Sequence, residues 1–143
     1  MNYKLLFPTY RTRYNHVRKF LHQHVTPLDN PLVLNLGTGE GDYDPMIAAA
    51  SGQVVACDIH EPDVRFAEQL NAHVPNLAYQ VENALELSFP DNHFDIIISI
   101  DVIEHTGDPD KMIEEINRVL KTGGKALLTY PHVHIPNTND PIN

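Results

Sequence analysis

The stretch from Pro31 to Asp44, PLVLNLGTGEGDYD, constrains the fold of this chain more than any other part. It contains a short apolar run that leads directly into three glycines at alternate positions. The run is typical of a buried strand, and the glycines predict a tight turn, because glycine adopts backbone conformations that a Cβ forbids. Such a turn also lets the backbone approach a ligand closely. The stretch therefore predicts a strand that ends at a binding loop.

Apolar runs and helical patterns alternate along the rest of the chain. Strands are expected in PLVLNLG, QVVACD, NLAYQVENA, FDIIISI and KALLTYP. Helices are expected over 13–24, in DYDPMIAAASG, in EPDVRFAEQLNAH, and from Asp108 and Pro109 through Leu120 to a stop at KTGG. This alternation predicts right-handed crossovers and a doubly wound, mostly parallel α/β sheet with helices on both faces. Ligands of such sheets bind beyond the carboxyl ends of the strands, where the glycine turn falls.

The composition limits the kind of protein and of partner. The 143 residues carry a formal net charge of −9, which argues against a nucleic-acid partner, because phosphate contacts need clustered Lys and Arg. The early basic cluster YRTRYNHVRK is either a solvated helix face or part of a ligand site. Cys57 is the only cysteine, so no disulfide forms within the chain. Without a membrane-length apolar stretch or a signal-peptide pattern, the sequence predicts a soluble cytoplasmic protein with no membrane partner.

The charges around the glycines narrow the ligand. A dinucleotide fingerprint would have its third glycine at position 42, which is Asp42 here, and no Gly-Lys-Ser/Thr of a P-loop follows. Together with Glu40 and Asp44, this carboxylate would repel a pyrophosphate. Asp58, about 20 positions after Gly37, either accepts hydrogen bonds from both ribose hydroxyls or caps the next helix. The pattern favours a nucleoside without phosphates.

Four segments in order resemble those of the class I S-adenosylmethionine-dependent methyltransferases, in the small-molecule, type 11-like branch. The segments are VLNLGTGEG, ACDIHEPDVRFAEQ, ENALELSFPDNHFDIIISIDVIEH and INRVLKTGGKALLTYP. The resemblance runs from about Pro31 to Tyr130. It implies a Rossmann-like sheet of order 3-2-1-4-5. It also implies S-adenosylmethionine as the cofactor, whose sulfonium and ammonium cations nearby carboxylates would attract, and S-adenosylhomocysteine as the product.

The resemblance also implies a set of cofactor-binding residues. The glycine loop would contact the methionine part through its backbone, and Asp58 would bind the ribose. Ile59 and the pair Asn83–Ala84 would contact the adenine. Asp101 would line the floor of the site near the sulfonium. The full set is Gly37, Thr38, Gly39, Gly41, Asp58, Ile59, Asn83, Ala84 and Asp101.

Three residues depart from the family pattern. Asn35 replaces the usual aspartate and loses a charge that would help to hold the amino end of the methionine. Thr38 replaces a common cysteine, which we expect to be harmless. Asn83 replaces the aspartate that faces the adenine amino group, although an amide carbonyl still accepts that hydrogen bond.

Methyl transfer needs positioning above all, and it needs a base only if the nucleophile must lose a proton. Candidates for that base are Glu104, His105 and His132. Alternatively, His105 caps the loop before Thr106. The segment PHVH spaces two imidazoles for a metal, but no matching third ligand cluster accompanies them, so no metal site is expected.

The sequence predicts an N-terminal helical segment over 1–30 and a cofactor-binding domain over 31–143. Family domains continue through two more strands, so we expect a sheet truncated after the fifth strand, either in a fragment or in a minimal form closed by a partner. The exposed edge of KALLTYP predicts a homodimer that pairs through this strand, unless the tail covers the edge. The leading interpretation is a small-molecule methyltransferase. The alternatives are a non-catalytic S-adenosylmethionine- or nucleoside-binding module, and an aminopropyl-transfer or redox domain.

Overall fold

The structure, a computed structural model, describes residues 3–25 and 30–131. Its elements are η1 (Tyr3–Leu6), α1 (Pro8–His24), β1 (Leu32–Leu36), α2 (Asp44–Ala50), β2 (Gln53–Asp58), α3 (Glu61–Leu70), β3 (Leu77–Val81), β4 (Phe94–Ile100), η3 (Ile103–His105), α4 (Pro109–Val119) and β5 (Leu120–Thr129). The strands form one sheet of order β3-β2-β1-β4-β5, and every neighbouring pair in it is parallel. The predicted doubly wound, Rossmann-like fold and its strand order are confirmed.

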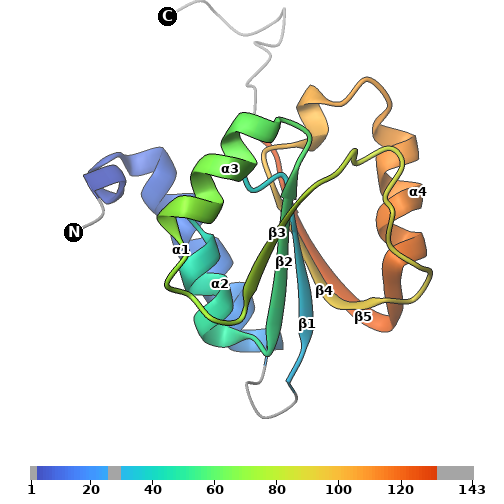
Figure 1. Ribbon diagram of the computed structural model, residues 1–143, viewed down its shortest axis with the longest axis horizontal. Coiled ribbons are helices and arrows are strands. Elements are labelled where there is room, and N and C mark those ends of the chain that lie inside the picture. The colour runs from blue at the N-terminus through green and yellow to red at the C-terminus, as the bar shows by residue number, and fades with distance from the viewer. Residues whose placement is uncertain (1–2, 26–29, 132–143) are drawn as a thin grey trace, which may run out of the picture.

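Helices cover both faces of the sheet. Figure 1 shows α1, α2 and α3 on one side and α4 on the other. Side chains of β1 alternate between the two faces, so Val33 packs with α1 and α2, whereas Leu34 and Leu36 pack with α4. The central strands are therefore apolar on both faces, as expected for a covered parallel sheet.

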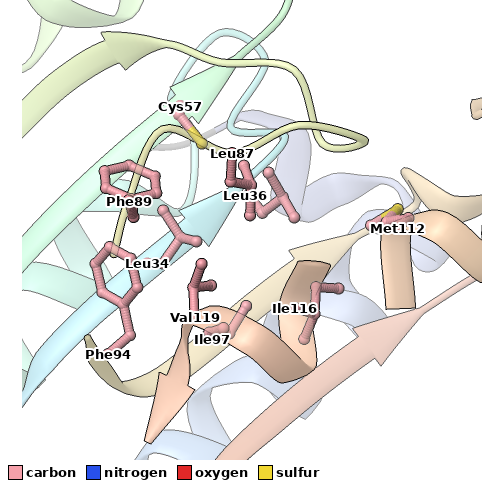
Figure 2. Packing of buried hydrophobic residues seen from close by; sticks show 10 residues of the cluster. All are labelled: Leu34, Leu36, Cys57, Leu87, Phe89, Phe94, Ile97, Met112, Ile116 and Val119. Carbon is pink, nitrogen blue, oxygen red and sulfur yellow. The ribbon is translucent and has the colours of Figure 1, made fainter. Parts of the chain in front are cut away.

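The core under α4 is the larger of the two apolar clusters. Its members come from β1, β2, β4, α4 and the segment after β3, and they are Leu34, Leu36, Cys57, Leu87, Phe89, Phe94, Ile97, Met112, Ile116 and Val119. Figure 2 shows these side chains between the sheet and the helix. Phe89 and Phe94 meet edge to face, with ring centroids 4.9 Å apart. This packing holds the strands in place, and the strands in turn position the loops that follow their carboxyl ends.

Helix α4 begins as the sequence predicts but ends earlier. The side chain of Asp108 accepts a hydrogen bond from the N–H of Lys111 over 3.0 Å, and Pro109 stands in the first turn. The expectation that the helix runs through Leu120 is wrong, because Leu120 already pairs with Phe94 as the first residue of β5. Gly123, with φ of 81°, lies within β5, where the register with β4 shifts.

Helix α1 is longer than expected. It begins at Pro8 rather than at residue 13, and it ends at His24 as predicted. Val17 and Leu21 are fully or almost fully buried against the sheet. Within the described residues, no helix has both the length and the apolar character that crossing a membrane requires.

Candidate functional site

The glycine loop, residues 37–41, leaves β1 in conformations that favour glycine. The φ angles are 84°, 55° and 82° at Gly37, Gly39 and Gly41. The N–H groups of Gly37 and Thr38 both donate to the carbonyl of Cys57 over 2.8 Å, which ties the loop to the end of β2. A Cβ at position 37 would lie 2.1 Å from Cγ2 of Val102. The loop and the segment after β4 therefore meet only because position 37 has no side chain.

Asp58, the last residue of β2, contacts the glycine loop directly. Its Oδ2 accepts a hydrogen bond from the N–H of Gly39, and its Oδ1 accepts one from the N–H of His60, each over 3.0 Å. The second bond forms a turn before α3 rather than a cap on the helix's first turn. Each carboxylate oxygen keeps acceptor capacity for another donor. The side chain is therefore held in place and still able to bind hydroxyl groups.

The segment after β3 forms the next side of the site. The Oδ1 of Asn83 accepts a hydrogen bond from the N–H of Leu85 over 3.0 Å, which orients the amide. One further lone pair and the NH₂ group of that amide remain for a ligand. Ala84 and Ile59, which lies directly after β2, line the same cavity, and the Ile59 side chain is largely exposed there.

Asp101 follows β4 with φ of 55°, a conformation that is uncommon outside glycine. Its Oδ1 accepts a hydrogen bond from Oγ1 of Thr129 over 3.1 Å. Its Oδ2 lies 2.7 Å from Nε of Arg13 in an ion pair. Asp101 thus lines the cavity as a carboxylate that is already paired with a cation of α1.

The N-terminal elements form a wall of the cavity. The rings of Tyr10 on α1 and Tyr43 before α2 stack with their centroids 5.4 Å apart. The Nζ of Lys4 pairs with Asp42 and lies 3.6 Å from Oε2 of Glu40. The hydrogen bond to Asp42 raises the pKa of Lys4, so the ammonium stays charged. This one ammonium therefore offsets only one of the two loop carboxylate charges, and the side chain of Glu40 stays largely exposed.

The third carboxylate of the loop sequence, Asp44, points away from the cavity and is fully buried. It accepts three hydrogen bonds: from Nδ2 of Asn35 over 2.6 Å, from Oγ1 of Thr38, and from the hydroxyl of Tyr79 over 2.7 Å. Burial raises the pKa of Asp44, and the three donors act against that rise. The expectation of three carboxylates around the ligand therefore holds for only two of them.

These residues surround a cavity of about 660 Å³ at the carboxyl ends of the strands. The predicted residues that line it are Gly37, Thr38, Gly39, Asp58, Ile59, Asn83, Ala84, Asp101 and His105. Its size is that of a small-molecule site. The sequence does not assign Lys4, Tyr10 and Tyr43 to this site, although Tyr10 lies in the basic cluster for which a ligand role is one of the two sequence-based interpretations.

Not every predicted residue is among those that line the cavity. Gly41 instead packs inward, where a Cβ would lie 2.8 Å from Cβ of Ala67. Glu104 pairs with the largely exposed His105, with Oε1 and Nε2 3.5 Å apart. His132 lies outside the described residues. Within 3–25 and 30–131, no group of three or more His, Cys, Asp or Glu side chains is arranged to hold a metal ion.

The chain is similar to a known protein family. A model described as a methyltransferase domain matches residues 34–128. A probable S-adenosylmethionine-dependent methyltransferase of Mycobacterium tuberculosis is 32% identical over 113 residues, which are 78% of this chain and 40% of the relative. A ubiquinone/menaquinone biosynthesis C-methyltransferase of Hydrogenovibrio crunogenus is 35% identical over 103 residues, 68% of this chain and 41% of that protein. The chain thus spans about two fifths of the length of these relatives.

Solved structures give the same result for the fold. The YcgJ protein of a Bacillus species superimposes with a TM-score of 0.76 at 27% identity, over 82% of this chain and 50% of that one. The PH0226 protein of Pyrococcus horikoshii superimposes with a TM-score of 0.72 at 30% identity, over 90% of this chain and 65% of that one.

Proposed function

Since the chain belongs to the family of methyltransferase domains, we propose that it transfers the methyl group of S-adenosylmethionine to a small-molecule acceptor by in-line displacement. S-adenosylmethionine is the cofactor that the family implies, and S-adenosylhomocysteine is the corresponding product. Because the chain spans about two fifths of its curated relatives, the activity of the whole protein is part of the proposal.

The observation that carries the proposal is that the glycine loop, Asp58 and Asn83 all line the same cavity. Asp58 offers acceptors to a ribose, and Asn83 offers both an acceptor and donors to a base. A Cβ built at position 39 would meet nothing within 4 Å, so the backbone there is open to a ligand. The donors and acceptors fit an adenosine that lacks phosphates.

The chain's own residues would bind and orient the reactants. When bound, S-adenosylmethionine supplies an electrophilic methyl group, and rate then depends on holding a nucleophile in line with it. The stacked rings of Tyr10 and Tyr43 give one wall of the cavity an aromatic surface. Burial raises the pKa of Tyr43 well above its ordinary value, so this phenol keeps its proton and is no base at neutral pH. Among the described residues, His105 is the only imidazole that lines the cavity, and it is placed to take a proton from an acceptor hydroxyl or amine.

Three observations support a small-molecule acceptor. The cavity volume of about 660 Å³ leaves limited room beside a cofactor. The net charge of −9 disfavours a nucleic-acid acceptor. A relative named for ubiquinone/menaquinone biosynthesis also has a small-molecule product in its name.

A methyl-transfer assay tests this proposal. The full chain is incubated with methyl-labelled S-adenosylmethionine and a panel of phenols, amines, thiols and quinols. We expect acceptor-dependent labelling that stops when S-adenosylhomocysteine is added. For a hydroxyl or amine acceptor, His105→Gln should slow transfer while leaving cofactor affinity unchanged. Labelling of nucleic acid with none of the panel labelled would overturn the small-molecule assignment.

A second candidate is a non-catalytic S-adenosylmethionine- or nucleoside-binding module. One observation favours it: Lys4 pairs with Asp42 and lies close to Glu40, and its positive charge offsets one of these two negative charges, so the loop attracts a cationic cofactor less than its sequence predicts. This candidate predicts that the cofactor and its demethylated product bind with similar affinity, and that no acceptor is methylated.

A further inference from the structure

One acceptor in the cavity wall has no donor. Asn35, near the end of β1, lines the cavity and is 2% exposed. Its Nδ2 donates to Oδ1 of Asp44 over 2.6 Å. Its Oδ1 is buried and has no hydrogen-bond partner among the residues that the structure describes. Because an unpaired buried acceptor is costly, it points to a donor that arrives with a ligand.

The orientation of this amide is fixed by Asp44. A carboxylate accepts hydrogen bonds and donates none, so Asn35 must present its NH₂ group to it and turn its carbonyl away. Thr38 and Tyr79 both donate to the other oxygen of the same carboxylate, Oδ2. The carboxylate is thereby held from three elements: β1, the glycine loop and β3. The carbonyl of Asn35 is therefore left without a donor because these contacts hold the carboxylate of Asp44, and with it the NH₂ group of Asn35, in place.

The neighbours of that carbonyl indicate which part of a ligand it meets. Asn35 stands on β1 directly before Leu36 and the glycine loop, whereas Asn83 comes after β3, which β2 separates from β1 in the sheet. If the adenosine lies between Asp58 and Asn83, the remaining part of S-adenosylmethionine extends along the loop. That part ends in an ammonium and a carboxylate, and only the ammonium can donate to a carbonyl.

Resting on the proposed function, we propose that Asp44 is a positioning residue that holds Oδ1 of Asn35 ready to accept a hydrogen bond from the ammonium of S-adenosylmethionine. Position 35 carries a neutral amide, and the carboxylate stands one hydrogen bond further from the ligand, at Asp44 on α2. The site thus keeps a negative charge behind the ammonium, although the contacting atom is neutral.

A pair of ligands separates this role from a structural one. S-adenosylhomocysteine carries the amino-acid end, and 5′-methylthioadenosine lacks it. In calorimetric titrations, Asn35→Leu should weaken the binding of S-adenosylhomocysteine about tenfold or more, the usual worth of a hydrogen bond to a charged group, and leave that of 5′-methylthioadenosine unchanged. The matched control is Asn83→Leu, on the adenosine side of the cavity, which should weaken both ligands alike.

Two further variants test the role of Asp44 itself, and they keep the inference testable if Asn35→Leu fails to fold. Asp44→Asn frees the amide of Asn35 to turn, so the preference for S-adenosylhomocysteine over 5′-methylthioadenosine should fall about tenfold. In the double variant Asn35→Asp/Asp44→Asn, the new amide at position 44 donates to the new carboxylate at position 35 and still accepts from Thr38 and Tyr79. That variant should regain the wild-type preference or exceed it.

The outcomes distinguish this inference from the proposed function. If the wild type binds neither ligand, the proposed function fails, and the inference fails with it. If the wild type binds both but Asn35→Leu weakens them equally, only the inference is overturned. It is also overturned if the double variant discriminates between the ligands no better than Asp44→Asn does.

Discussion

The carboxylate of Asp58, at the end of β2, accepts a hydrogen bond from the backbone N–H of Gly39, in the loop after β1, with 3.0 Å between Oδ2 and N. This contact joins the two carboxyl ends of neighbouring parallel strands at the place where a nucleoside would bind. It also makes the acid part of the loop's own structure, so a change at Asp58 affects both the ligand and the loop.

Asp58→Ala should therefore weaken the binding of S-adenosylhomocysteine and 5′-methylthioadenosine together. The loss of charge-assisted bonds to the ribose hydroxyls, each worth about 1.5–3 kcal/mol, corresponds to roughly tenfold or more in affinity. Calorimetry on both ligands checks this. Asp63→Ala, which removes a half-buried carboxylate of the neighbouring helix α3 that pairs with His60, is the control and should change neither affinity. Unchanged affinity in Asp58→Ala would show that the ribose lies elsewhere.

Two glycines of the loop should respond differently to the same substitution. Gly37→Ala combines a positive φ with a Cβ 2.1 Å from Val102, and it should lower the free energy of unfolding by about 2–4 kcal/mol. Gly39→Ala meets open space, so its cost should be only the strain of its φ of 55°, about 1–2 kcal/mol, with a loss of cofactor affinity because the methyl group enters the cavity.

Urea denaturation and calorimetry measure the two effects of these alanines. Gly107→Ala is the control, since its Cβ would meet nothing within 4 Å and its φ is not positive. It should leave the free energy of unfolding within about 0.5 kcal/mol of the wild type. Equal destabilisation by Gly37→Ala and Gly39→Ala would contradict the close approach of Val102 to the loop.

The sequence predicts the scaffold of the site better than its walls. The strands are predicted from local apolar runs, and β2 and β4 fall on QVVACD and FDIIISI as expected. The pairing of Arg13 with Asp101 joins residues far apart in the chain, and it depends on how α1 packs on one face of the sheet, which no local pattern encodes. The sequence pattern also does not predict whether the side chain of Asp44 points into the cavity or into the core. In the structure this side chain is fully buried.

Stability at acidic pH should depend on Glu115 of α4. Its carboxylate accepts hydrogen bonds from Arg118 and from the N–H of Leu87, and these contacts hold its pKa below the ordinary value of 4.5. A lowered folded-state pKa means that the folded chain binds the proton less readily than the unfolded chain. The contribution of Glu115 is therefore present above about pH 4.5 and is lost as the pH falls through the lower, folded-state pKa.

Glu115→Gln should accordingly lower the free energy of unfolding by about 1 kcal/mol near pH 7, and by progressively less below the ordinary pKa of the carboxyl group. Denaturant titrations of both proteins across that range give the difference, in which the contributions of other acids cancel. Glu114→Gln, on the exposed neighbouring position, is the control and should show no such trend. A difference that grows towards low pH would contradict the sign of the Glu115 shift.

Strand β5 pairs with β4 alone among the described residues, so one edge of it carries unpaired N–H and C=O groups. We propose that a second copy of the chain pairs with this edge. Light scattering should then give a mass that rises from monomer towards dimer with concentration, and amide exchange in β5 should slow in parallel. The other edge strand, β3, is the internal control. A monomer at every concentration, with β5 amides that exchange freely, would rule this association out.

Titration calorimetry of the wild-type chain with S-adenosylmethionine, S-adenosylhomocysteine and NAD tests the central claim most directly, because the three ligands share an adenosine and differ in the group attached to its ribose. The cavity presents Asp58 to a ribose but no Gly-x-Gly-x-x-Gly loop to a pyrophosphate. We predict saturable, one-to-one binding of S-adenosylmethionine and S-adenosylhomocysteine, and no heat from NAD. Tight binding of NAD, with none of S-adenosylmethionine, would contradict the account.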